Sequence, residues 1–101
     1  MFVVLLRFSD NKAAAPDHME GHKRWIAHGF DDGVFALVGS LQPNQGGAIL
    51  AHNATRAALE TRVEADPFVA ENVVTAEILE IDPAHADDRL GFLMAPQAVS
   101  A

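Results

Sequence analysis

A proline at position 67 limits how the second half of this chain can fold. Proline disfavours helical geometry in the residue before it, so a helix leading up to Pro67 should end at or near Asp66. An acidic residue is unfavourable at the C-terminal end of a helix, which carries partial negative charge. We therefore expect Asp66 either to begin an Asp-Pro turn or to be needed for the group that it faces, and we predict that this group is His22.

The length and charge of the chain limit its class. With 101 residues, half of them hydrophobic, it is a single globular domain. A net charge of −7 and seven Lys and Arg residues argue against nucleic acid and anionic membranes as partners. The absence of cysteine excludes disulfides and thiolate metal sites. Without a signal-peptide core or an apolar stretch of membrane-spanning length, we expect a cytoplasmic protein that has no membrane partner.

The first half of the chain predicts three strands and one helix. The strands span Phe2 to Phe8, Val34 to Ser40 and Gly47 to Ala51, and the first is nearly continuously apolar, as expected of a central strand. The helix runs from Ala13 to about Asp32 and is ended by Gly33. One face of this helix is marked by residues at three- and four-residue spacing, with a histidine in its middle. These residues are Met19, His22, Ile26, Gly29, Phe30 and Gly33, and Trp25 flanks this face.

The second half predicts one helix, one strand and a tail. Thr55 is a suitable N-cap for a helix from Arg56 to Ala65, and the last strand runs from Val73 to Ile81. We divide the domain into a core, residues 1–82, and a C-terminal tail, residues 83–101. The tail contains an apolar run, Leu90 to Met94, which we expect to pack against protein, for instance a second subunit.

The predicted order β-α-β-β-α-β is that of a ferredoxin-like α+β plait. Both helices should then pack on one face of a four-stranded antiparallel sheet, and the other face needs a cover. A second copy of the chain is the simplest cover, so we predict a homodimer.

Several segments resemble the YciI-related family of the dimeric α+β barrel superfamily. The most specific is Ala65-Asp66-Pro67-Phe68-Val69, followed by Val73. Weaker matches are the histidine-bearing segment Glu20 to Trp25, the strand end Val38-Gly39-Ser40 and the strand entry Gly46-Gly47. The resemblance covers residues 1–81 and implies the dimeric α+β barrel fold.

The resemblance also implies a site. The family pattern carries a presumed active-site His–Asp pair, which falls here on His22 and Asp66. Many relatives have an arginine three residues before the histidine, where this chain has Met19, so an anion-binding role of that arginine does not carry over. One relative eliminates chloride from a chlorinated hydroxyhydroquinone, and muconolactone isomerases share the barrel. The resemblance thus implies a lyase or isomerase that acts on a small molecule.

In such a site, imidazole would transfer the proton while the carboxylate fixes its tautomer. We expect the substrate pocket to be lined by Trp25, Ser40 and Phe68. No cofactor and no metal are predicted.

Three other interpretations stay open at this point. A histidine on an apolar helix face is most often a core residue with one satisfied hydrogen bond. His18, His22 and Asp66 would form a metal site if they met, although their spacing alone does not establish one. Finally, the domain would bind a small ligand without catalysis if it kept the pocket but not the chemistry.

Overall fold

The computed structural model describes residues 1–94 and contains the predicted elements in the predicted order. The strands are β1 (Phe2–Phe8), β2 (Phe35–Leu41), β3 (Gly46–Ala51) and β4 (Val74–Glu80). The α-helices are α1 (Ala15–Asp31), α2 (Arg56–Glu64) and the short α3 (Pro67–Ala70). Two 3-10 helices, η1 (Lys12–Ala14) and η2 (Asp88–Leu93), precede α1 and follow β4.

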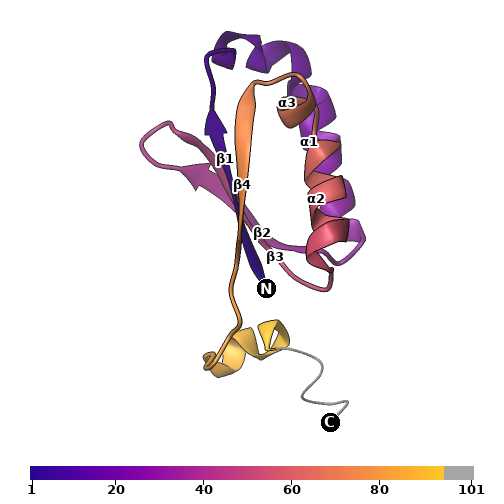
Figure 1. The fold of residues 1–101 in the computed structure, drawn as a ribbon, viewed down its shortest axis with the longest axis vertical. Coiled ribbons are helices and arrows are strands. Elements are labelled where there is room, and N and C mark those ends of the chain that lie inside the picture. The colour runs from indigo at the N-terminus through magenta and orange to yellow at the C-terminus, as the bar shows by residue number, and fades with distance from the viewer. Residues whose placement is uncertain (95–101) are drawn as a thin grey trace.

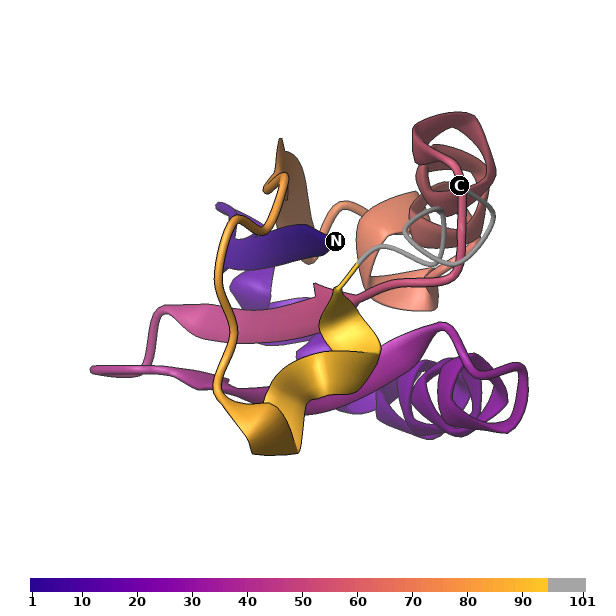
Figure 2. The ribbon, with the colours of Figure 1, turned by 90° about the horizontal axis from the view of Figure 1, so that it is seen from below.

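The four strands form one antiparallel sheet in the order β2-β3-β1-β4. Helices α1 and α2 lie side by side on one face of this sheet (Figures 1 and 2). This is the ferredoxin-like plait, so the predicted fold class is confirmed. β1 pairs with β3 on one side and β4 on the other, as its apolar sequence predicted for a central strand.

The core lies between the sheet and the two helices. Along β1 the alternate residues Phe2, Val4 and Leu6 are buried against the helices. From α2, Leu59 and Val63 fill the space above them. Burial of each such aliphatic side chain stabilises the fold by about 1.5–3 kcal/mol. The helices are therefore fixed on this face by packing, which is what places their inward side chains.

Close approach of α1 to the sheet depends on a glycine. A Cβ at Gly29 would lie 2.1 Å from the ring of Phe35, the first residue of β2. Gly33, with φ of +73°, then turns the chain from the helix into that strand. The sequence prediction that Gly33 ends the helix is borne out by this geometry.

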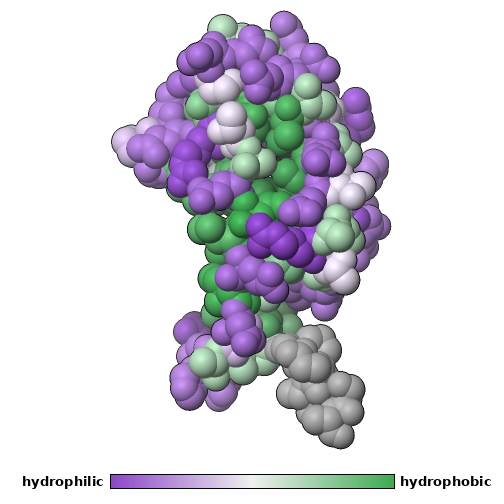
Figure 3. All heavy atoms as spheres, in the orientation of Figure 1, coloured by the Kyte–Doolittle hydropathy of each residue, from purple (hydrophilic) through white to green (hydrophobic). Residues whose placement is uncertain are grey.

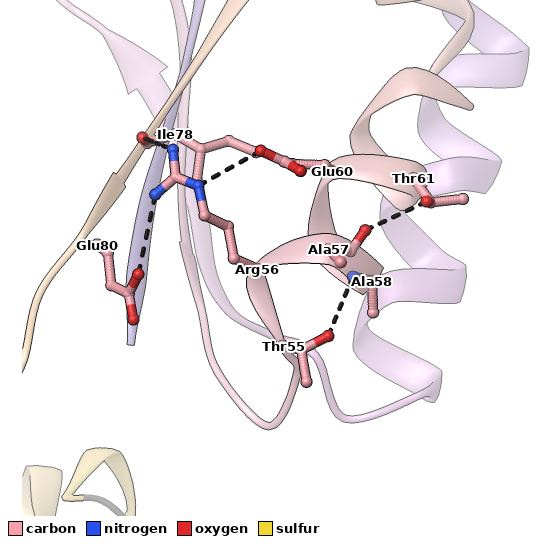
Figure 4. Close-up of polar contacts among 8 residues, drawn as sticks. All are labelled: Thr55, Arg56, Ala57, Ala58, Glu60, Thr61, Ile78 and Glu80. Atoms are coloured by element: carbon pink, nitrogen blue, oxygen red, sulfur yellow. Dashed lines mark hydrogen bonds and ion pairs between the residues drawn. The ribbon is translucent and has the colours of Figure 1, made fainter.

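Polar contacts attach α2 to the edge strand β4 (Figure 4). Thr55 caps the helix by accepting a hydrogen bond from a backbone amide of its first turn. Arg56 reaches across to the sheet, where Nη2 donates to the carbonyl oxygen of Ile78 over 3.0 Å. The same guanidinium pairs with Glu60 and Glu80. Exposed ion pairs add little stability, but the bond to a β4 carbonyl occupies a backbone group of the edge strand.

The tail leaves the far end of β4 and forms η2 below the sheet (Figure 1). Leu93 is buried, whereas 45% of Leu90 and 55% of Phe92 are exposed. Figure 3 shows apolar surface along β4 that continues down to this segment. The predicted packing of Leu90 to Met94 is therefore realised within the chain only in part. Residues 95–101 of the predicted tail lie outside the described residues.

No helix within residues 1–94 has the length and apolar composition that crossing a membrane requires.

Candidate functional site

His22 lies in the middle of α1 on the side that faces the sheet. The 3.6-residue period places Met19 and Ile26 on the same side, one turn before and one turn after it. All three side chains line one pocket between α1 and the sheet. Only 15% of the His22 side chain is exposed. The helix therefore presents its histidine to a partly open pocket rather than directly to bulk water.

Asp66 occupies a different position from the one predicted. It was predicted at the C-terminal end of the second helix, but α2 ends at Glu64 and Asp66 is the N-cap of α3. Its Oδ1 accepts a hydrogen bond of 3.0 Å from the backbone amide of Phe68, and Pro67 takes the first helical position. The unfavourable placement of an acid at a helix C-terminus therefore does not arise.

The structure brings His22 and Asp66 together. Nδ1 of His22 lies 2.8 Å from Oδ1 of Asp66, whose side chain is fully buried. Burial of a carboxylate is costly unless it is paired and hydrogen-bonded. With Asp66 as an acceptor, the shared proton belongs on Nδ1, which leaves a lone pair on Nε2. Nε2 makes no hydrogen bond within residues 1–94 and is not closed off from solvent.

Phe68 fixes the plane of the imidazole. The two rings stack with centroids 4.0 Å apart and an angle of 4° between their planes. Phe68 itself is held in place because its amide donates to Asp66. Asp66 therefore orients His22 directly through Nδ1 and indirectly through the position of the aromatic ring.

The pocket beside His22 has a volume of about 260 Å³. Phe68 and Ser40 line it, as predicted, and Ser40 contributes from β2 on the wall opposite α1. Most of the other lining residues have apolar side chains or are glycines. The full lining comprises Leu6, Phe8, Met19, His22, Ile26, Val38, Gly39, Ser40, Gly46, Gly47, Ala48, Ile49, Phe68 and Val74.

Trp25 does not share this pocket, contrary to the prediction. It points between α1 and α2, where its Nε1 donates a 2.8 Å hydrogen bond to the carbonyl oxygen of Arg62. There it lines a separate cleft. The indole NH needs an acceptor when buried, and the last turn of α2 supplies one. Trp25 remains close to His22, with ring centroids 5.9 Å apart and 22° between the ring planes.

Sequence reasoning did not place Gly46 and Gly47 in the pocket. Gly46 has φ of +131°, and a Cβ there would lie 1.9 Å from the carbonyl oxygen of Leu6. Because glycine has no side chain, β3 can begin close to β1, and no side chain projects from this position into the pocket. The sequence indicated that the Gly-Gly pair begins a strand. Whether the pair faces α1 depends on the register of the sheet, which the sequence does not give.

The described residues contain no group of three or more His, Asp and Glu side chains that could hold a metal ion. Of the three residues considered for such a site, His22 and Asp66 are in contact with each other through a single hydrogen bond. The arrangement is therefore a His–carboxylate pair at the edge of a largely apolar pocket, which can accept and return a proton.

Comparison with known proteins identifies the fold. No protein-family model matches the chain, and no curated protein is significantly similar to it in sequence. Among solved structures, it is similar to 5-chloro-2-hydroxyhydroquinone dehydrochlorinase from Burkholderia phenoliruptrix AC1100, in complex with 2,5-dihydroxybenzoquinone. The TM-score is 0.65 at 13% identity, over 86% of this chain and 100% of that chain. Similarity at this identity establishes a shared fold and not a shared reaction.

Proposed function

We propose that this chain is a small-molecule enzyme in which His22 transfers a proton with the support of Asp66. The observation that carries this proposal is the 2.8 Å contact between His22 Nδ1 and a fully buried Asp66, beside a pocket that His22 itself lines. Because the contact occupies Nδ1, Nε2 is the ring nitrogen left for a substrate. A general base must reach the proton that it removes, and this arrangement provides that access.

The proposed chemistry is an elimination or an isomerisation. Nε2 takes a proton from a carbon or hydroxyl of the substrate, and the electron pair of the broken bond moves into the ring. In an elimination this pair expels a leaving group such as chloride, while in an isomerisation the imidazolium returns the proton to a different atom. Asp66 stabilises the imidazolium between the two steps, as carboxylates do in other His-dependent enzymes.

Two further points support a lyase resembling the dehydrochlorinase. That protein shares the fold, and its name states a dehydrochlorination of a hydroxylated ring. The Asp66-Pro67-Phe68 segment, which suggested the YciI-related family, is also the segment that builds the site. We include membership of that family in the proposal.

The test measures chloride release from 5-chloro-2-hydroxyhydroquinone and, in parallel, exchange of ring protons for deuterium in D₂O. Removal of a general base costs about 10²- to 10⁴-fold in rate, so His22→Asn and Asp66→Asn should lose at least about 100-fold. His28→Asn, an exposed histidine on the same helix, is the matched control and should keep full activity. Equal rates for wild type and His22→Asn would contradict the proposal.

One observation favours a different function, a non-catalytic domain that binds a small ligand. Oδ1 of Asp66 also accepts the hydrogen bond that caps α3, which gives the carboxylate a purely structural use. In that case His22→Asn and Asp66→Asn would lower the melting temperature, since each leaves a buried group unpaired, and ligand binding would persist without turnover.

We also propose that the chain forms a homodimer through the sheet face that the helices leave open. The strand registers align four apolar residues in one row across the whole sheet: Leu37 pairs with Leu50, Leu50 with Val3, and Val3 with Leu79. Leu37 is 53% exposed and Leu79 is 43% exposed. A continuous apolar row on an open face favours association.

Light scattering tests this arrangement. The wild-type chain should have the mass of a dimer at micromolar concentration. Leu50→Glu, which places a charge in the centre of the row, should give a monomer. Ala57→Glu, which introduces the same charge on the exposed side of α2, should leave the dimer intact. A wild-type monomer, or a dimer that survives Leu50→Glu, would refute the proposed interface.

A further inference from the structure

We infer that the pocket at His22 takes an uncharged planar ring compound that carries a hydroxyl group, and that it rejects anions. This inference rests on the proposed function, because it assigns a class of ligand to the same site.

The pocket has no charged side chain in its lining apart from His22 when protonated. Behind His22 lies the buried carboxylate of Asp66. The pair therefore carries no net charge when the imidazole is protonated and a single negative charge when it is neutral. In neither state does the site compensate the charge of a carboxylate or phosphate, whose transfer from water into apolar surroundings is costly.

The size of the pocket matches one ring with a few substituents. A cavity of 150 Å³ is large enough to bind benzene, and this pocket measures about 260 Å³. The stacked rings of His22 and Phe68, with 4° between their planes, form part of its lining. Aliphatic side chains of the sheet, such as Leu6 and Ile49, form part of the remaining surface. A planar ring fits between such surfaces with little exposed apolar area.

Two polar groups would orient the ring. Nε2 of His22, with its lone pair, accepts a hydrogen bond from a ligand hydroxyl. Ser40 on β2 lines the same pocket, and its hydroxyl forms no hydrogen bond within the described residues. Since the serine hydroxyl both donates and accepts, it suits a second oxygen on the ring. A ligand with a hydroxyl group therefore uses both anchors, whereas an apolar ring uses neither.

Met19 gives this selectivity a position where it can be changed. It lines the pocket one helical turn before His22 and is 37% exposed. A long cationic side chain at this position reaches the pocket while its charged end stays near water. Met19→Arg should therefore supply the positive charge that the wild-type lining lacks, and Met19→Gln is the matched uncharged control.

Calorimetric binding at neutral pH, with no turnover required, tests the inference with three probes. 4-Hydroxybenzyl alcohol and 4-hydroxybenzoate have similar shapes but differ in charge, and 4-methoxytoluene carries no hydroxyl proton. We expect wild type to bind the alcohol at least about tenfold more tightly than the benzoate. Met19→Arg should strengthen benzoate binding by about tenfold, and Met19→Gln should leave the ratio unchanged. The methoxy compound should bind about threefold or more weakly than the alcohol.

Each result that contradicts the inference would overturn a different part of it. If wild type binds the benzoate as tightly as the alcohol, or binds neither at millimolar concentration, the assignment of an uncharged ligand is wrong. Equal binding of the methoxy compound would remove the role of the hydroxyl. Failure of Met19→Arg to gain benzoate affinity would show that missing charge does not set the selectivity. Retained selectivity without chloride release or proton exchange would contradict only the proposed catalytic function.

Discussion

The hydrogen bond between His22 and Asp66 should contribute a coupling free energy that a double-mutant cycle can isolate. It joins Nδ1 to Oδ1 over 2.8 Å, and the carboxylate is fully buried. Hydrogen bonds to charged groups contribute about 1.5–3 kcal/mol to stability. We expect the coupling between the two side chains to lie in this range.

The substitutions must remove this bond and leave its surroundings intact. Asp66→Ser shortens the side chain so that it no longer reaches His22, while serine still caps α3 by accepting from the amide of Phe68. His22→Phe keeps the stacked ring on Phe68 but removes both ring nitrogens. By itself His22→Phe leaves a buried carboxylate short of one partner, which should cost about 3–5 kcal/mol. The double variant should lose less free energy of unfolding than the sum of the losses of the two single variants.

Unfolding in urea at neutral pH, at one fixed protein concentration, gives the four free energies that the cycle needs. A second cycle that combines Asp66→Ser with His28→Phe serves as the control and should give a coupling within about 0.5 kcal/mol of zero. If the His22 cycle also falls within about 0.5 kcal/mol of zero, the two side chains do not form the bond described here, and the geometric basis of the site is wrong.

Two further predictions concern other parts of the chain. Gly46→Ala should destabilise the fold by more than about 2 kcal/mol, because its Cβ would meet the Leu6 carbonyl at a positive φ. Gly91→Ala is the control: its Cβ would lie in open space, so the melting temperature should change little. The hydrogen bond from the Arg89 side chain holds the pKa of Asp87 below its ordinary value. The stabilising effect of this pair on η2 should therefore be present at higher pH and fade as the pH falls through the lowered pKa. An NMR titration should show this low midpoint, and Arg89→Ala should raise it.

The sequence was sufficient to predict the fold because its signals are local and agree with one another. A central strand read from Phe2 to Phe8 matches β1, and Thr55 and Gly33 lie at the helix ends that they predicted. The order of elements then leaves the ferredoxin-like plait as the arrangement that buries both helices on one sheet face. Each step used only periodicity and end signals, which depend on neighbouring residues.

The errors occurred where long-range contacts decide the outcome. Helix α3 has four residues, too few for a hydrophobic period to indicate it. Trp25 was predicted in the pocket because it flanks the inward stripe of α1, but the acceptor for its indole NH is a carbonyl of α2. Which side of a helix stripe a large residue takes depends on such a partner, and the partner lies 37 residues away in sequence.

Asp66 links the local and the long-range contributions. A single oxygen, Oδ1, accepts both the amide of Phe68 and Nδ1 of His22. The first bond is local, and the Asp-Pro pair alone would predict a turn there; the second joins α1 to α3 across 44 residues of sequence. Because Phe68 also stacks on His22, the start of α3, the plane of the imidazole and one wall of the pocket depend on the same carboxylate. A change at Asp66 or at His22 therefore alters folding and the site together, whereas Met19, which lines the pocket from α1, allows the selectivity to be tested separately from this pair.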